Sequence, residues 1–370
     1  MIRKPVRHIR DNWKEKVEKA GFYFYEMDGI PYWDESVFYD FTSGQIDHLE
    51  DATRELYRLC LTLVPYVIEH NLYEKIGIPP QFSAYIKRSW DRKEPSLYGR
   101  FDLWYNGESE PRLLEFNADT PTALFEASVI QYFWLQDYQP GKDQFNSIHE
   151  KLLDAMKRDM KRYAGSGTLY FSCVRESLED YTTVEYMRDI AVQASITTKH
   201  IHIEDVGYNF GRKTFVDLDN SPIRFMFKLY PWEWIIREDF SQHLKDTEIT
   251  LIEPAWKMIL SNKAILPLLW EMYPDHQNLL PAFFEPPNNG TTYVEKPFFS
   301  REGENIRTGT SFLRSRNNVI YQKYKELPDF SGNYPVIGSW VIGSEPAGMG
   351  IREDTTPITN NLSRFVPHMF

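Results

Sequence analysis

The sequence predicts a protein of the α/β (α+β) class, in which helices and strands share one globular unit. Three observations support this prediction. Apolar residues recur at helical spacing over residues 45–72, strand-like and helix-like stretches alternate over residues 168–223, and the last third of the chain is rich in short apolar strands. With 370 residues, 42% of them hydrophobic and 26% charged, the chain is long enough for a large core or for two lobes around a cleft.

The first part of the chain is expected to hold one long amphipathic helix and a pair of strands. Charged residues separate the apolar positions of residues 45–72, which is typical of a helix with one buried face. After the break at Pro79, the stretches RFDLWY and RLLEF read as two strands joined by a turn at Gly107. We expect another helix to begin near Pro121, because Thr120 can cap it and proline suits a first helical turn.

The middle and last parts of the chain continue this alternation. TLYFSCV reads as a strand, LEDYTTVEYMRDIAVQA as a helix, and HIHIED and KTFVDL as further strands. Helical patterns follow in WIIREDFSQHL and AWKMILSNKAILPLLWEMY, before the Pro/Asn/Gly-rich stretch PAFFEPPNNGTT. Beyond it, TYVEKPFF, NVIYQKY, PVIGSWVIG and AGMGIRED read as strands. Nothing in the sequence demands two independently folding domains.

Charge and cysteine content limit the expected partners and compartment. The 53 acidic residues outnumber the 42 basic ones, giving a formal charge of −11, which argues against nucleic acid and is compatible with a cationic partner such as a polyamine. Only Cys60 and Cys173 are present, and neither belongs to a CxxC pair, so we expect no disulfide framework and a reducing compartment. The sequence lacks an apolar run of roughly 20 residues, so we expect a cytoplasmic protein with no membrane partner.

Oxygen-bearing side chains gather around the predicted pair of strands. Alternation puts Glu115 and Asn117 on one face of the second strand, and an antiparallel partner can bring Asp102 beside them. Three such ligands suit Mg²⁺, which prefers oxygen and completes its shell with water and phosphate. The alternative is an ordinary solvated hairpin face with an Asx turn at Asn117, and spacing alone favours that alternative.

Basic residues near glycines form a second candidate group, made up of Lys263, Lys296 and Arg352. Lys296 lies on a predicted strand before a loop that contains Gly303, where the backbone can approach closely and its amide groups can cradle a phosphate. The loop does not match a Walker A sequence. The stretch Gly348-Met-Gly350 is a weaker signal, because glycines near strands more often mark a turn or a bulge.

Two further features have alternative interpretations. His200 and His202 would point the same way from one strand and could bind a transition metal, but an exposed or hydrogen-bonded strand face is the more common arrangement. Cys173 lies in an apolar strand, where a thiol is usually a small buried side chain, so we do not expect a cysteine nucleophile.

Several motifs occur along the chain in a fixed order: GRFD, LEFNADTPTALFEA, FKLYPWEW, EPAWKMILSNKAILPLLWEMYP, KPFFSREGEN, and GIREDTTPIT followed by SRFVPH. Together they resemble the glutathionylspermidine synthetase family, in particular its stand-alone bacterial members. The resemblance covers about residues 21–368. It implies the permuted ATP-grasp fold of that family, in which the nucleotide lies between two sheet-containing lobes and the magnesium ligands come early in the sequence.

The resemblance also implies roles for the candidate residues, and it reverses the preference for an ordinary hairpin face. The implied roles are magnesium binding for Asp102, Glu115 and Asn117, ATP binding for Arg100, Lys263, Lys296, Gly303, Gln322, Tyr324 and Thr359, substrate binding for Thr120, Thr122 and Glu179, and transition-state stabilisation for Arg352. Glu179 would hold a cationic amine, and its alternative is an ordinary acidic first turn of a helix.

Under this resemblance, residues 1–370 form one catalytic unit with three approximate lobes. Residues 1–165 would be the helical region with the magnesium ligands, 166–255 a central α/β substrate region, and 256–370 the ATP-grasp nucleotide-binding region.

The implied activity is that of a ligase that uses Mg²⁺ and ATP to join a carboxylate, such as that of a peptide, to a polyamine or another amine through an acylphosphate. We expect no amidase domain like that of the bifunctional members, because these 370 residues have neither room nor a suitable motif for one. Thr120 replaces a serine of those members and Leu229 a hydroxyl residue, so glutathione itself is not implied. The rival interpretation is a nucleotide-binding regulatory or partner-binding protein on the same fold. The sequence leaves open the acid, the amine, and whether the chain is a monomer or a homodimer.

Overall fold

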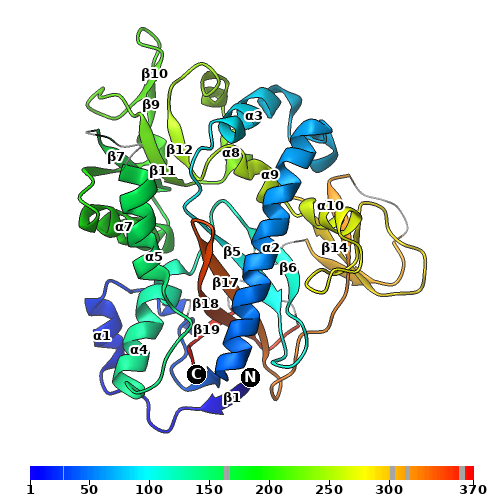
Figure 1. Ribbon diagram of the computed structural model, residues 1–370. Helices are drawn as coiled ribbons and strands as arrows, with labels where there is room; N and C mark the ends of the chain where they lie inside the picture. The colour runs from blue at the N-terminus through cyan, green and yellow to red at the C-terminus, as the bar shows by residue number, and fades with distance from the viewer. Residues whose placement is uncertain (28, 162–164, 166, 301–304, 313–316, 358–362) are drawn as a thin grey trace.

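The structure is a computed structural model that describes residues 1–27, 29–161, 165, 167–300, 305–312, 317–357 and 363–370 (Figure 1). Three larger sheets organise it, a central one flanked by two others. Figure 1 shows the sheet of β7, β11 and β12 on one side of the central strands and the sheet that contains β14 on the other.

The central sheet is antiparallel and has the strand order β19-β18-β17-β5-β6. Its strands come from the first and last thirds of the chain: β5 (Tyr98–Trp104), β6 (Arg112–Asn117), β17 (Tyr334–Ile342), β18 (Glu345–Asp354) and β19 (Arg364–Val366). The two predicted strands RFDLWY and RLLEF are therefore confirmed as neighbours. In their register Asp102 lies opposite Glu115, and Arg100 lies opposite Asn117.

One face of the central sheet is covered by the long helix α2 (Ser43–Glu69), whose existence the apolar spacing predicted. Thr42 and Gln45 form a capping box at its start, which satisfies backbone N–H groups that the first turn leaves unpaired. Thr53 of α2 bonds Ser339 of β17 with an Oγ1···Oγ distance of 2.6 Å. Because side chains alternate along a strand, Gly338 and its neighbour Asp102 on β5 face the opposite side.

That opposite side is partly covered by the helical segment that follows β6. Its members are the π-helical turns η3 (Glu126–Ile130) and η4 (Met156–Met160) and the helices α4 (Gln131–Tyr138) and α5 (Ile148–Ala155). A helix begins near Pro121, as expected, but its first helical residue is Leu124, because the backbone stays irregular through Ala123, which has a left-handed φ of 64°. The expected cap at Thr120 was therefore wrong. Thr120 and Thr122 are therefore in a connecting segment and not in a helical turn.

The second sheet is parallel and has the order β12-β11-β7-β8. It consists of β7 (Leu169–Cys173), β8 (Thr198–His202), β11 (Phe225–Leu229) and β12 (Thr250–Ile252), with α7 (Leu178–Gln193) packed against β7 and β8. The strand predicted for HIHIED ends at His202, where the short turn η5 (Ile203–Asp205) begins. The strand predicted for KTFVDL is β10 (Thr214–Val216), which pairs with β9 (Gly207–Asn209).

The third sheet is antiparallel and has the order β13-β16-β14-β15. Its strands are β13 (Ala282–Phe283), β14 (Tyr293–Pro297), β15 (Arg307–Gly309) and β16 (Val319–Lys323). The helical stretch before it is divided into α9 (Lys257–Leu260) and α10 (Ile265–Met272), and Lys263 lies in the break between them.

The remaining elements join or close these layers. β1 (Ile2–Pro5), β4 (Val37–Asp40) and β20 (His368–Met369) form a small sheet that brings the two termini together (Figure 1). The others are α1 (Trp13–Lys19), β2 (Glu26–Met27), β3 (Ile30–Pro31), η1 (Glu74–Ile76), η2 (Pro80–Phe82), α3 (Ser83–Asp91), α8 (Trp232–Ile235) and η6 (Asp239–His243). None of the described helices is both long and apolar enough to cross a bilayer. The division into three lobes stays a prediction.

Candidate active site

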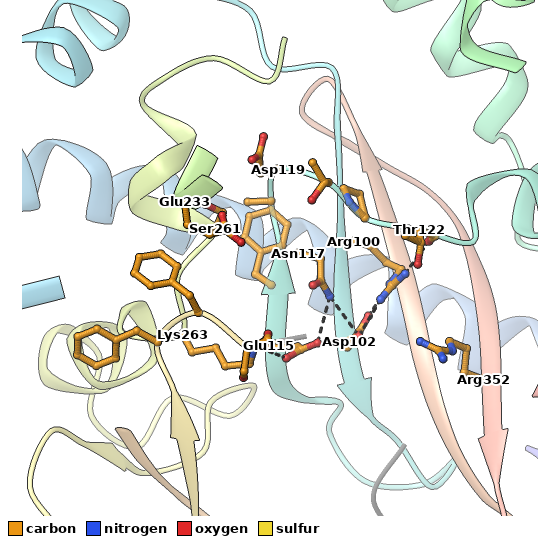
Figure 2. A pocket seen from close by; sticks show the side chains of 17 residues that line it. Arg100, Asp102, Glu115, Asn117, Asp119, Thr122, Glu233, Ser261, Lys263 and Arg352 are labelled. Carbon is orange, nitrogen blue, oxygen red and sulfur yellow. Dashed lines mark hydrogen bonds and ion pairs between the residues drawn. The ribbon is translucent and has the colours of Figure 1, made fainter. Parts of the chain in front are cut away.

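The three expected magnesium ligands lie together on the face of the central sheet that α2 does not cover. The Nδ2 atom of Asn117 is 3.2 Å from Oδ2 of Asp102 and 3.3 Å from Oε1 of Glu115 (Figure 2). Two carboxylates and a side-chain amide within one hydrogen-bonded group form a donor set that suits Mg²⁺. Asn117 would present its oxygen to an ion after rotation of its amide, which exchanges the positions of oxygen and nitrogen.

Basic side chains surround these carboxylates. Arg100 makes a bidentate contact with Asp102, with Nε–Oδ1 and Nη2–Oδ2 distances of 2.6 and 3.0 Å. Lys263 places its Nζ 3.1 Å from Oε2 of Glu115. Burial opposes ionisation of Glu115, but Lys263 and Lys296 outweigh that effect and lower its pKa to about 2. The Glu115 carboxylate is therefore negatively charged at neutral pH.

Lys296 lies on β14 and reaches the edge of the central sheet. Its Nζ donates to the backbone oxygen of Leu114 over 2.9 Å and to Oε1 of Gln322 over 2.7 Å. Burial, only partly offset by Glu115, lowers the Lys296 pKa to about 8. A buried ammonium group whose nearby carboxylates, Glu115 and Asp102, do not offset its burial is suited to bind a further anion, such as a phosphate.

Arg352 belongs to β18, which is separated from β5 by β17 in the central sheet. Its side chain lies on the same face of the sheet and points toward Arg100 and Asp102 (Figure 2). Two strand glycines, Gly338 and Gly350, line a small pocket together with Arg352. A Cβ atom on Gly338 would lie 2.8 Å from Cδ of Arg100, and one on Gly350 would lie 2.6 Å from the ring of Phe365. Gly350 is thus required by close packing within a strand, and neither a turn nor a bulge explains it.

These side chains line a pocket of about 910 Å³. Polar and charged groups dominate its wall. They include the residues expected to act on metal, nucleotide or peptide: Arg100, Asp102, Glu115, Asn117, Thr120, Thr122, Lys263 and Arg352. Figure 2 shows that they come from β5, β6, β18 and the segments that follow β6 and α9. Residues more than 200 positions apart in the chain therefore meet in one cavity.

A second pocket of about 750 Å³ shares Asp102 and Glu115 with the first and extends toward the third sheet. Lys296, Gln322 and Tyr324 line it. Lys325 also belongs to its wall and lies 3.8 Å from the centre of the Trp104 ring. The two pockets thus place a charged compartment beside a less polar one, which matches the phosphates and the base of a nucleotide. Gly303 and Thr359 lie outside the described residues.

The expected amine ligand Glu179 lies in the first turn of α7, close to the first pocket. Arg352 and the side chain of Thr122 are near enough to lower its pKa. Burial, followed by repulsion from Glu126 and Asp180, outweighs these effects and raises the Glu179 pKa to about 7. Glu126 itself is fully buried and accepts a 2.6 Å hydrogen bond from the hydroxyl of Tyr32. Carboxylates thus gather beside Arg352.

Sequence reasoning missed several residues at the site, Glu126 among them. Asp119 lines the first pocket, and its Oδ1 accepts a 2.6 Å hydrogen bond from Nζ of the fully buried Lys228. Asp119 could have been found from its position in the motif that contains Asn117 and Thr120. Nothing in the pattern around Glu126 distinguishes it from an ordinary helical carboxylate.

His200, His202 and Cys173 lie together under α7, away from the pocket just described. The Sγ atom of Cys173 is 4.0 Å from Nε2 of His200. Burial raises the Cys173 pKa to about 12, so the thiol is protonated at neutral pH. The histidines are only partly buried.

Comparison with known sequences identifies relatives along the whole chain. The glutathionylspermidine synthase preATP-grasp family matches residues 4–370. A Haemophilus influenzae protein named "Putative acid--amine ligase" is 40% identical, over 98% of this chain and 97% of its own length. The bifunctional glutathionylspermidine synthetase/amidase of Escherichia coli is 25% identical over 89% of this chain. Trypanothione synthetase of Crithidia fasciculata is 28% identical over 78% of it.

The alignments cover different shares of these relatives. This chain spans 49% of the trypanothione synthetase and 58% of the bifunctional enzyme. Among solved structures, a glutathione synthetase-like effector from Globodera pallida superposes with a TM-score of 0.60 at 9% identity, over 99% of both chains. The mixed α/β fold of glutathione synthetase-like ATP-grasp proteins, expected from the sequence, is therefore confirmed.

Proposed function

Because this chain belongs to the glutathionylspermidine synthase preATP-grasp family, a family of ATP-dependent acid–amine ligases, we propose that it joins a peptide-like carboxylate to a polyamine or another amine. The observation that carries this proposal is the pocket in which Asp102, Glu115 and Asn117 lie among Arg100, Lys263 and Arg352. Such an alternation of anionic and cationic groups suits a metal-bound triphosphate, whose own charges alternate in the same way.

The proposed reaction has two steps. In the first, an oxygen of the acid substrate attacks the γ-phosphorus of ATP, the bond to the β,γ-bridging oxygen breaks, and ADP leaves with that electron pair. In the second, the amine nitrogen attacks the acyl carbon, phosphate leaves, and the nitrogen loses one proton. The sum is ATP, acid and amine converted to ADP, phosphate and amide.

The pocket residues support the first step by position and charge. Asp102, Glu115 and Asn117 would hold Mg²⁺, which neutralises phosphate oxygens when it is bound. Lys263 and Lys296 hold the anionic phosphates. Arg352 and Arg100 stabilise the charge that develops on the transferred group, because preorganised donors cost little reorganisation at the moment of reaction.

The second step needs an amine with a free electron pair, and Glu179 is placed to serve it. As a carboxylate it attracts a cationic amine toward Arg352 and the acyl group. With a pKa of about 7, it can also accept the proton that the nitrogen loses. The charges of Glu126 and Asp180, which act on Glu179, increase the preference of this region for a substrate with more than one positive charge.

The test is a substrate matrix with the purified full chain. ADP release is measured with Mg-ATP and every pair drawn from γ-glutamyl peptides, amino acids, polyamines and diamines, and mass spectrometry detects condensed amides. We expect ADP release that requires one acid and one amine together, with the matching amide in equal amount. Asp102→Asn is the inactive reference, and Asp51→Asn, on the exposed side of α2, is its matched control.

Two results would count against the proposal. ATP binding without turnover across the matrix would favour the nucleotide-binding regulatory protein over the ligase. Failure to bind Mg-ATP would remove both interpretations, because the pocket would then not be a nucleotide site.

A further inference from the structure

Three side chains with nitrogen or sulfur donors converge at one end of the parallel sheet. Strand β7 pairs in parallel with the edge strand β8, and in their register Cys173 lies opposite His202 and Phe171 opposite His200. Cys173, His200 and His202 therefore project from the same face, the face that α7 covers. Each can offer one donor atom such that all three atoms lie within 4.8 Å of one another.

We propose that Cys173, His200 and His202 bind a zinc-like transition-metal dication. Thiolate and imidazole are the ligands that zinc and its neighbours prefer, whereas Mg²⁺ and Ca²⁺ prefer oxygen. The site would thus differ in metal class from the oxygen-rich pocket at Asp102. Among the described residues, this trio is the one group of His, Cys, Asp and Glu side chains whose donor atoms gather this closely.

The distances are compatible with a metal site after a small adjustment. Zinc bonds of about 2.3 Å to sulfur and 2.0 Å to nitrogen imply donor separations of roughly 3.3–3.7 Å in a tetrahedral shell. The Sγ of Cys173 and Nε2 of His200 are 4.0 Å apart, and all three donor atoms lie within 4.8 Å of one another, so the donors must close by up to about 1.5 Å. The two imidazoles are partly buried on the edge strand β8, and the ring of His200 also meets the ring of Tyr181, with 5.3 Å between their centres.

A second observation at the histidines points to the same ligand. The Nδ1 atom of His202 is buried and has no hydrogen-bond partner within the described part of the chain. A buried imidazole nitrogen without a partner carries a desolvation cost of about 1–3 kcal/mol, which a bond to a metal would remove. The rings of His200 and His202 meet edge to face with their centres 4.8 Å apart.

The electrostatic surroundings also suit a cation. Asp180, Glu185 and Glu204 all act on the Cys173 thiol, and of these Glu185 is paired with Arg188. When the metal binds, the thiol proton is replaced by the metal–sulfur bond and passes to solvent. The connecting residues 174–177 join this site to the first turn of α7, which carries Glu179.

The experiment uses Co²⁺ as a spectroscopic stand-in for Zn²⁺, with the reduced full chain and excess Mg²⁺ to occupy oxygen ligands. We expect one equivalent of Co²⁺ to produce thiolate-to-cobalt charge-transfer absorption, and one equivalent of Zn²⁺ to abolish it. Cys173→Ser should remove the absorption. His202→Gln should weaken Co²⁺ binding by more than about tenfold, since even partners that only orient a ligand cost about 10- to 100-fold.

Matched variants exclude other thiols and histidines. Cys60→Ala alters the other cysteine, which is a buried residue of α2, and His70→Gln alters an exposed histidine. Both variants should bind Co²⁺ like the unaltered chain. If Cys173→Ser fails to fold, the variants of the partly buried His200 and His202 decide the result. Absence of the charge-transfer band, or a band that His200→Gln and His202→Gln leave unchanged, would overturn the proposal.

Discussion

Asp102 and Glu115 each contact a basic side chain, so a nucleotide that binds here must provide new partners for both the carboxylates and the basic groups. Arg100 donates twice to Asp102, and Lys263 lies 3.1 Å from Glu115. A metal-bound triphosphate brings both a cation for the carboxylates and anions for the basic groups. The carboxylates can thus exchange their basic partners for the metal, and the basic groups can exchange the carboxylates for phosphates. No charge is left unpaired, and an unpaired charge in a buried site would cost free energy.

Replacing Asp102 by asparagine removes one negative charge and keeps the side-chain size. We expect the Kd for Mg-ATP to rise about 10- to 100-fold, because a contact to a charged group contributes about 1.5–3 kcal/mol. Isothermal titration measures the change, with Asp51→Asn as the exposed control. Unchanged affinity in Asp102→Asn would remove this residue from the metal-binding set.

Arg352→Ala should reduce turnover far more than nucleotide affinity. A preorganised donor that acts on the transition state typically contributes about 100- to 1000-fold to kcat. The measurements are kcat from ADP release and Kd from titration with Mg-ATP, compared with Arg352→Lys, which keeps the charge but not the planar donor group. Equal losses in kcat and in ATP affinity would assign Arg352 to nucleotide binding alone.

Glu179 should give the reaction a pH dependence in its amine step. Its pKa is about 7, so it is protonated below that pH and can neither attract a cationic amine nor accept a proton. The kcat/KM for the amine should therefore rise with pH through about 7. Glu179→Gln should remove this rise, whereas Glu176→Gln, an exposed neighbour three positions earlier, should keep it. A rise that persists in Glu179→Gln would rule out Glu179 as its source.

At the scale of single elements, a glycine of β18 allows close packing of its neighbours beside Arg352. Gly350 packs against Phe365 and Ala127, and Arg352 follows on the same face two positions later. A larger side chain at position 350 would have to displace the Phe365 ring, which is 1% exposed. The glycine thus fixes how closely β19 and η3 approach the strand that carries Arg352.

Gly350→Ala should therefore destabilise the fold. Its added Cβ would lie 2.6 Å from the Phe365 ring, and overpacking of this kind costs about 1–3 kcal/mol. Urea unfolding followed by tryptophan fluorescence measures the free energy of unfolding. Gly141→Ala is the matched control, because a Cβ there would meet nothing within 4 Å. Equal free energies of unfolding for the two variants would show that the Phe365 ring and β18 shift to accept the added methyl group without loss of stability.

The helix expected near Pro121 begins three residues later, at Leu124, so the start and the cap that the sequence suggested were wrong. Thr120 and Pro121 have the composition of a helix start, but Ala123 adopts a left-handed φ of 64°, which alanine disfavours. Tertiary contacts decide this conformation: Arg100 donates to the backbone oxygen of Thr122 over 2.6 Å. No local pattern could reveal a bond to a residue 22 positions away.

Across the whole molecule, strands and helices with strong periodicity were predictable, and so was the pairing of Asp102 with Glu115. Local alternation was sufficient there, because the two strands are consecutive. Spacing alone favoured an ordinary hairpin face, since it could not show that Lys263 and Arg352 meet the same carboxylates. Family resemblance supplied that grouping. Glu126, the Asp119–Lys228 pair and the convergence of Cys173 with His200 depend on sheet order, which the sequence pattern does not specify.

The central claim is that the pocket at Asp102 transfers phosphate from ATP to a carboxylate before an amine attacks. The most direct measurement follows ¹⁸O from the labelled carboxylate of the acid substrate into inorganic phosphate during turnover. An acylphosphate predicts one labelled oxygen in each phosphate released, in step with ADP and amide. Unlabelled phosphate released at the same rate as ADP would mean that water attacks ATP directly, and would contradict the ligase mechanism.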